Sequence, residues 1–133
     1  MEQEQDYPTV EVENGKVFPS EKNTIRVHKD DTYGGAHEYI ITNCLGFSGG
    51  QTQYDNTTQR IKFVKKLDDG KMESGLQSEQ LVLVLIDRQK KLNARFPSPF
   101  NEKALFGLQI FLDAQRARVQ DRIDRGVMGE LKN

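Results

Sequence analysis

The hydrophobic pattern of this chain changes its period near Gly75, and this change constrains the fold more than any other feature. Before Gly75, short runs rich in Ile, Val, Tyr and Thr are separated by Gly, Asn and Asp, which is typical of strands joined by turns. After Gly75, apolar residues recur at helical spacing in two long segments. The sequence therefore predicts an α+β protein: an N-terminal antiparallel β-sheet, then a C-terminal antiparallel helical hairpin, in one compact domain.

The β-rich half is expected to be a meander over residues 9–75, preceded by a flexible acidic tail at residues 1–8. Asn14-Gly15 lies between two β-prone runs and predicts a hairpin over residues 9–18. Because the connections are short, the strands should pair antiparallel. The other strands are expected at 24–28, 37–45, 51–54 and 59–66, with turns at 30–35 and 46–50.

The second half, residues 76–133, contains the two expected helices. Ser78 is the predicted N-cap of the first helix, and the helical spacing of Leu81, Leu85 and Leu92 favours a helix over a buried strand here. A linker over residues 93–99 follows, because its two prolines cannot continue a helix. Ser98-Pro99 predicts the next helix start, and Gly126 its end. The packed seam of this second helix is expected at Leu105, Leu108, Leu112, Gln115 and Val119.

Composition narrows the classes of function. The formal net charge is −1, whereas nucleic-acid-binding modules usually carry a basic excess, so nucleic acid is not the expected partner. The single Cys44 excludes an intramolecular disulfide and suggests a reducing compartment. No run approaches the about 18 apolar residues of a membrane span, and MEQEQD is unlike a signal peptide. A hydrophobic content of only 35% suggests either a chain that exposes much of its surface or a core completed by oligomerisation.

The most informative polar cluster is on the second helix, where Arg118, Arg122 and Arg125 fall within an arc of about 60°. This arc is adjacent to the packed seam and shares a stripe with small residues. One explanation is structural: cations favour a helix C-terminus and pair with Asp121 and Asp124. The other is an anion site, because guanidinium groups at i,i+4 spacing can hold one phosphate. The sequence pattern leaves both open.

Other candidate groups give weaker signals. His28, His37 and Cys44 lack metal-ligand spacing and a fourth ligand, so neither a metal nor another cofactor is expected. The sequence has no nucleophile elbow and no phosphate-binding glycine motif, so no enzyme is predicted. Asp87 fits an ion pair better than a catalytic role. Phe96 fits a plug for the helical hairpin better than a platform for base stacking.

The block from Ser74 to Lys132 resembles the helical hairpin shared by the Thoeris anti-defence sponges and the anti-CBASS sponges of phages. The resemblance rests on the glycine and IDR at the start of the first helix, on Asn101 and, above all, on the ending R-x-x-x-R-x-x-R-G-V-x-G. The β-rich half matches the Thoeris anti-defence type in architecture. The sequence departs from the family pattern at Leu92-Asn93, where an aromatic-Gln pair is common, and at Pro99-Phe100, where a Cys is common.

The resemblance implies a protein that traps a cyclic nucleotide immune signal without cleaving it, in the host bacterial cytoplasm. The ligand would be a cyclic ADP-ribose isomer or a cyclic oligonucleotide, held in pockets between subunits of a homo-oligomer. A dimer is the minimum, and a hexamer built from dimers is compatible. A nucleic-acid or protein-binding structural module and a signal-nucleotide hydrolase are the alternatives. The ligand-binding residues implied or suggested are Arg118, Arg122, Asn101, Arg125, Phe96 and Asp87.

Overall fold

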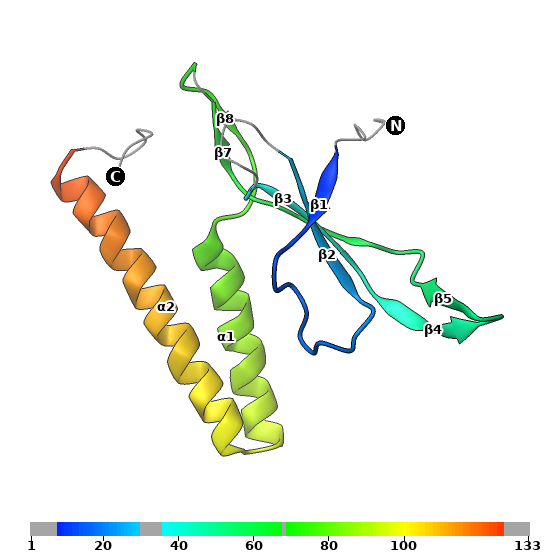
Figure 1. Ribbon diagram of the computed structural model, residues 1–133. Coiled ribbons are helices and arrows are strands. Elements are labelled where there is room, and N and C mark those ends of the chain that lie inside the picture. The colour runs from blue at the N-terminus through cyan, green and yellow to red at the C-terminus, as the bar shows by residue number, and fades with distance from the viewer. Residues whose placement is uncertain (1–7, 30–35, 68, 127–133) are drawn as a thin grey trace. The chain divides into compact units, whose positions relative to one another are not determined.

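The computed structural model describes residues 8–29, 36–67 and 69–126 (Figure 1). These residues form two compact units that divide between Gly75 and Leu76, with residues 69–71 grouped with the helices. Each unit is described by itself. The predicted acidic tail (except Pro8), the predicted turn at residues 30–35 and residues 127 and 129 of the C-terminal motif lie outside the described residues.

The first unit is built on a four-stranded antiparallel sheet in the order β1-β2-β3-β6. In this sheet Val10, Val27, Tyr39 and Ile61 are cross-strand neighbours and make an apolar row. The next row, Glu11-Arg26-Ile40-Arg60, points to the other face and is mostly charged. The strands are β1 (Thr9–Glu11), β2 (Thr24–His28), β3 (Glu38–Thr42) and β6 (Gln59–Lys62).

Two further strands, β4 (Cys44–Ser48) and β5 (Gln51–Tyr54), form a separate antiparallel ribbon between β3 and β6 in the chain. The ribbon turns at Gly49-Gly50, where φ is +59° and +77°. A two-residue turn with both φ values positive suits glycine and matches the twist of the strands. A second short ribbon pairs β7 (Lys65–Lys66) with β8 (Met72–Glu73).

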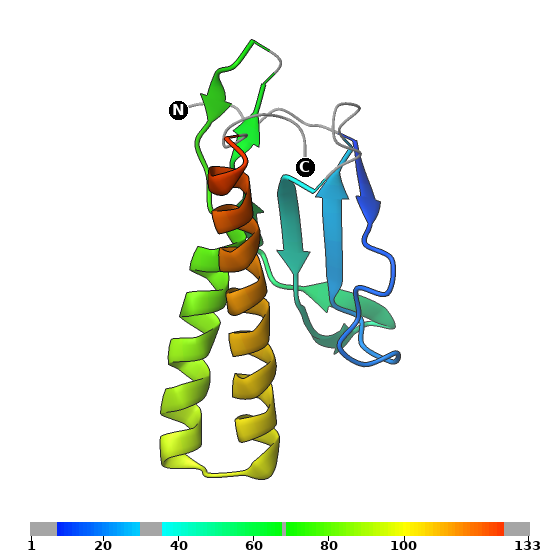
Figure 2. The same cartoon turned by 90° about the vertical axis from the view of Figure 1, so that its left-hand side faces the viewer.

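The second unit is a hairpin of two helices, α1 (Ser78–Arg95) and α2 (Pro99–Asp124), which lie side by side in both views (Figures 1 and 2). Ser98 caps α2, because its Oγ accepts from the backbone N–H groups of Phe100 and Asn101 at 3.1 and 3.2 Å. The helix ends before Gly126, whose φ is +69°. The α+β architecture and the helical hairpin are therefore confirmed.

The two helices meet along a narrow seam of alternating 3- and 4-residue spacing, as in a coiled coil. Its centre is fully apolar: Val82, Ile86 and Leu112 are buried, and Leu105 and Leu108 pack against them. Only 2% of Leu112 is exposed. The other seam positions are half-buried and mostly polar, at Glu79, Gln89, Asn93, Asn101 and Gln115; half-buried Val119 and Arg122 continue the same spacing on α2 beyond the end of α1.

The predictions for the helical unit were wrong in two details. Gln77, not Ser78, is the N-cap of α1, and its N–H donates to Gln80 Oε1 at 2.9 Å. The predicted linker at residues 93–99 is shorter, because α1 continues to Arg95. The structure adds which face of α1 is buried: the seam follows Val82 and Ile86, and Leu85 is exposed. The run LVLVLI is apolar on every side, so its periodicity could not identify the buried face.

The predictions for the β half were wrong in its pairing details. The Asn14-Gly15 turn forms, with Gly15 N–H donating to Val12 O at 3.1 Å, but residues 16–18 make no strand and β1 pairs with β2 instead. The predicted strand at 37–45 breaks at Asn43, and the predicted strand at 59–66 breaks after Lys62. The predicted turn at 46–50 is smaller, because Gly46–Ser48 belongs to β4. Pairing with distant strands overrode these local signals.

Gly75 is held where a side chain has no room, and this makes a testable prediction. A Cβ at Gly75 would lie 2.5 Å from the carbonyl carbon of Phe63 and 2.7 Å from Lys62 O. Because both are backbone atoms, rotation of a side chain cannot relieve the clash. We expect Gly75→Ala to lower the free energy of unfolding by about 1–3 kcal/mol, measured by chemical denaturation.

The matched control is Gly107→Ala on α2, where no atom lies within 4 Å of an added Cβ. In a helix interior this change should leave stability unchanged or raise it by up to about 1 kcal/mol. Equal stability of the Gly75→Ala variant and the unmodified protein would contradict the close backbone approach.

Candidate functional site

The arginine cluster lies in the last turns of α2, and its three members differ in their surroundings. Arg118 is exposed and has no hydrogen-bond or ion-pair partner among the described residues. Arg122 is half-buried and continues the 3-4 spacing of the helix seam. Arg125 caps the helix, and its Nε donates to Asp121 Oδ2 at 2.9 Å. The structural explanation therefore applies to Arg125, whereas Arg118 is available to an anion.

These arginines lie on a part of α2 that extends beyond α1. Helix α2 has 26 residues and α1 has 18, and the Gln89–Asn101 contact sets their antiparallel register. In that register the N-terminus of α1 lies opposite the middle of α2, near Leu112 and Gln115. The last turns of α2, which carry all three arginines, therefore have no helical neighbour from α1, as Figure 2 shows.

Asn101 lies at the opposite end of α2 and has a structural role there. Its Nδ2 donates to Phe96 O at 3.0 Å, and its Oδ1 accepts from Gln89 Nε2 at 3.4 Å. These bonds tie the inter-helix loop to the start of α2 and the end of α1. Asn93 supports the same loop by accepting from Ser98 N–H at 3.1 Å.

Of the other two predicted residues, Phe96 lies in the loop itself and Asp87 lies in the middle of α1. The ring of Phe96 is 62% exposed, and the Arg95 guanidinium lies over it, 5.2 Å from its centroid. Phe100, in the first turn of α2, is 85% exposed. Asp87 is exposed and pairs with Lys91 at 2.9 Å, which is an ordinary i,i+4 ion pair.

Five of the six predicted residues therefore lie at opposite ends of the hairpin: Phe96 and Asn101 at the loop end, and the three arginines at the other end. Asn101 and Arg118 are seventeen positions apart, which corresponds to about 26 Å along the helix axis. A helical wheel places these residues around the axis but hides this distance along it. Within one copy of the chain, a small cyclic nucleotide cannot contact both groups at once.

Sequence reasoning missed the seam position of Arg122 and the loop-closing bonds of Asn101. The seam position had a signal, because Arg122 follows Val119 by three residues in the same 3-4 series. The bonds of Asn101 had none, since its acceptor Phe96 O belongs to a loop whose conformation the sequence does not specify.

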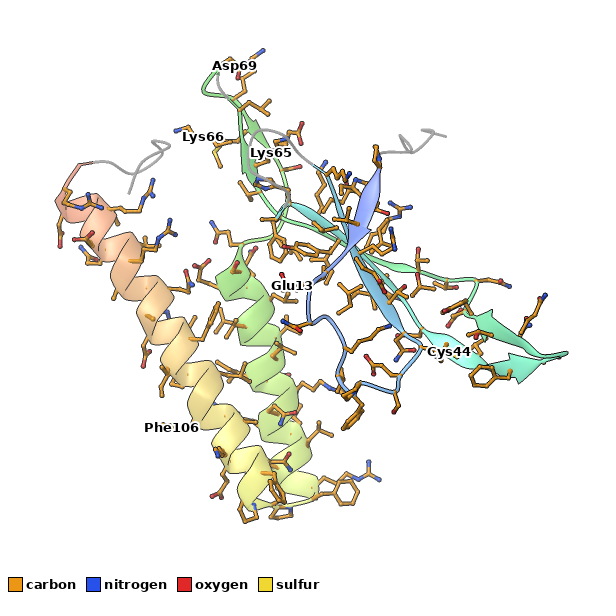
Figure 3. All side chains as sticks on the ribbon, viewed as in Figure 1. Glu13, Cys44, Lys65, Lys66, Asp69 and Phe106 are labelled. Carbon is orange, nitrogen blue, oxygen red and sulfur yellow. The ribbon has the colours of Figure 1, made fainter. Side chains whose placement is uncertain are left out.

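The β half carries polar groups of its own, within a unit separate from the helices. Lys65 and Lys66 form β7 and are labelled in Figure 3. The ammonium group of Lys62 lies 3.9 Å from Glu73 Oε2. Buried His28 places Nδ1 3.1 Å from Glu38 Oε2. Among the described residues, no three His, Cys, Asp or Glu side chains converge as metal ligands would.

The loop-end geometry predicts that Asn101 and Arg118 contribute differently to stability. Asn101→Ala removes two hydrogen bonds that close the loop and should lower the free energy of unfolding by about 1 kcal/mol. Arg118→Ala removes an exposed side chain that has no partner within the described part of the chain, and it should leave stability unchanged. Urea unfolding of both variants tests this, and an unaltered midpoint for Asn101→Ala would contradict its structural role.

None of the described helices is long and apolar enough to cross a membrane. No protein-family model matches this sequence, and no curated protein is significantly similar to it.

Proposed function

We propose that this protein captures cyclic nucleotide immune signals of bacteria and holds them without cleaving them, as the phage sponges that its helical hairpin resembles do. The observation that carries the proposal is the arginine cluster on the end of α2 that extends beyond α1, with Arg118 exposed and without a partner among the described residues. Arg118 and Arg122 are four residues apart, so their guanidinium groups project from the same side of the helix. That arrangement suits the oxygens of one phosphate group.

The second part of the proposal is that the binding site is completed by another copy of the chain. The separation of about 26 Å between Asn101 and Arg118 cannot be spanned by one small ligand. Two α2 helices packed antiparallel would place the loop end of one copy beside the arginine end of the other. A two-fold dimer of this kind contains two equivalent pockets.

The surface of α2 supports this antiparallel contact. A second stripe with 3-4 spacing runs along the helix beside the seam, and every residue on it is exposed. A two-fold axis at Phe111 pairs Ala104 of one copy with Arg118 of the other, and Phe100 with Arg122. Small residues on both sides of Phe111 allow close approach. The stripe consists of Phe100, Ala104, Gly107, Phe111, Ala114 and Arg118.

In such a pocket the chemistry divides between the two copies. The arginines of one copy would hold the phosphates, while Phe96 of the other would stack on the base. Burial between subunits removes most of the ligand from water, which is how small-molecule sites reach high affinity. A protein that competes with a host sensor needs such affinity and no turnover.

Capture is tested by incubating the protein with a panel of cyclic ADP-ribose isomers and cyclic di- and trinucleotides, followed by filtration, heat denaturation and chromatography. We expect one ligand to disappear from the filtrate and to return unchanged on heating. Arg118→Ala and Arg122→Ala should each abolish this depletion. Arg116→Ala is the matched control, because Arg116 is exposed on the same helix but lies off the stripe.

Any other outcome of the capture experiment would contradict part of the proposal. A ligand that returns altered would identify a hydrolase. No depletion of any ligand would favour a binding module for a macromolecule. Depletion by both arginine variants at the level of the unmodified protein would show that the arginines do not form the site.

The shared pocket makes a separate prediction that a site within one copy does not make. Phe96→Ala and Arg118→Ala should each be inactive alone, because each damages both pockets of its dimer. When the two variants are co-expressed, half of the dimers are mixed, and one of their two pockets is intact. Capture should then recover to about a quarter of the normal level, as expected for random two-fold pairing.

Light scattering on each variant serves as the control for assembly. Co-expressed variants that form dimers yet stay inactive would show that Phe96 of one copy and Arg118 of the other do not meet in one pocket. A monomer at micromolar concentration for the unmodified protein would contradict the dimer itself.

A further inference from the structure

The β4–β5 ribbon differs in composition from the rest of the molecule. Residues 44–54, which span both strands and their turn, contain no charged side chain, although 29% of the whole chain is charged. The ribbon instead exposes three large side chains: Leu45 (70%), Phe47 (68%) and Tyr54 (43%). Surface rich in aromatic residues and poor in charge is the composition that marks the centre of protein–protein interfaces.

The edges of the ribbon are also open. Within the described residues, β4 and β5 pair only with each other, and no other strand or helix makes extensive contact with them. Each strand therefore presents an outer row of backbone N–H and C=O groups. An isolated two-stranded ribbon is only marginally stable in water, so added strands would stabilise this one.

The four-stranded sheet of the same unit has edges that oppose further pairing. Pro8 and Glu11 lie at the β1 edge, and Arg60 and Lys62 lie in β6 at the other edge. Proline and charged side chains at a sheet edge disfavour pairing with a further strand. The β4–β5 ribbon carries neither, since Gln51, Thr52 and Gln53 occupy most of β5. The contrast within one unit indicates that the ribbon is the edge kept open for a partner.

We propose that the β4–β5 ribbon is a self-association surface, on which the ribbon of a second copy of this chain pairs edge to edge. A two-fold contact places a surface against an identical surface, so any charge in it would face a like charge. A ribbon without charges meets this requirement. The absence of Lys and Arg also makes it unsuited to phosphate-rich partners. Two identical strands paired across a perpendicular two-fold axis run antiparallel, which is a regular way to extend a sheet.

This contact is independent of the proposed capture of nucleotides, because it involves the β unit alone. It is tested by placing a charge on the exposed Gln53, whose amide makes only long hydrogen bonds of 3.4 Å to neighbouring carbonyl oxygens. Gln53→Lys and Gln53→Glu should each reduce the mass of the assembly at least twofold in light scattering. An equimolar mixture of the two variants should restore the mass of the unmodified protein, because opposite charges then face each other.

Thr58→Lys is the matched control, since it adds the same charge in the exposed loop just after the ribbon and should leave the mass unchanged. Circular dichroism establishes that the variants are folded. Retention of the full mass by both Gln53 variants would overturn the proposal. Loss of mass without recovery in the mixture would also overturn it, because the partner would then not be an identical ribbon. Nucleotide capture by the same samples is measured separately, so failure of one proposal leaves the other intact.

Discussion

The helical unit is held together by one narrow apolar seam. Because the seam is narrow, many other apolar side chains of the two helices stay exposed. Only Val82, Ile86 and Leu112 are buried among the described helical residues, with Leu105 and Leu108 packed against them. Polar pairs such as Gln89–Asn101 close the loop end and fix the register of the two helices. A seam of this size covers one side of each helix. Leu83, Val84, Phe106 and Ile110 are left in solvent, and the labelled Phe106 lies away from α1 (Figure 3).

The sequence predicted the class of fold because its strongest signals are local. Ser98 before Pro99, and Gly126 after the last turn, define α2 by backbone chemistry that acts within a few residues. The errors came where distant residues decide. Asn14-Gly15 makes the predicted turn, yet the partner of β1 is β2, which lies beyond it. The cap of α1 was missed because Gln77 is an unusual cap, and it is supported by Gln80 from within the helix.

The candidate site was predictable in its residue types but not in its geometry. Spacing alone placed Arg118, Arg122 and Arg125 on one arc of the helix, and the structure adds that Arg125 is paired with Asp121 whereas Arg118 has no partner among the described residues. The distance from Asn101 to these arginines was equally present in the residue numbers. It becomes a constraint only when the residues between them are helical, because the chain can then no longer bend to bring the two ends together.

Two of the exposed surfaces, which lie on separate units, suit contacts between identical copies: the α2 stripe around Phe111 and the β4–β5 ribbon around Phe47. They do so for different reasons. The stripe has small residues on both sides of Phe111, which allow a second α2 to approach closely, whereas the ribbon has no charge that would face a like charge. A chain with two different two-fold contacts can close only into assemblies with an even number of copies. The two proposed contacts together would therefore restrict the number of subunits as well as cause association.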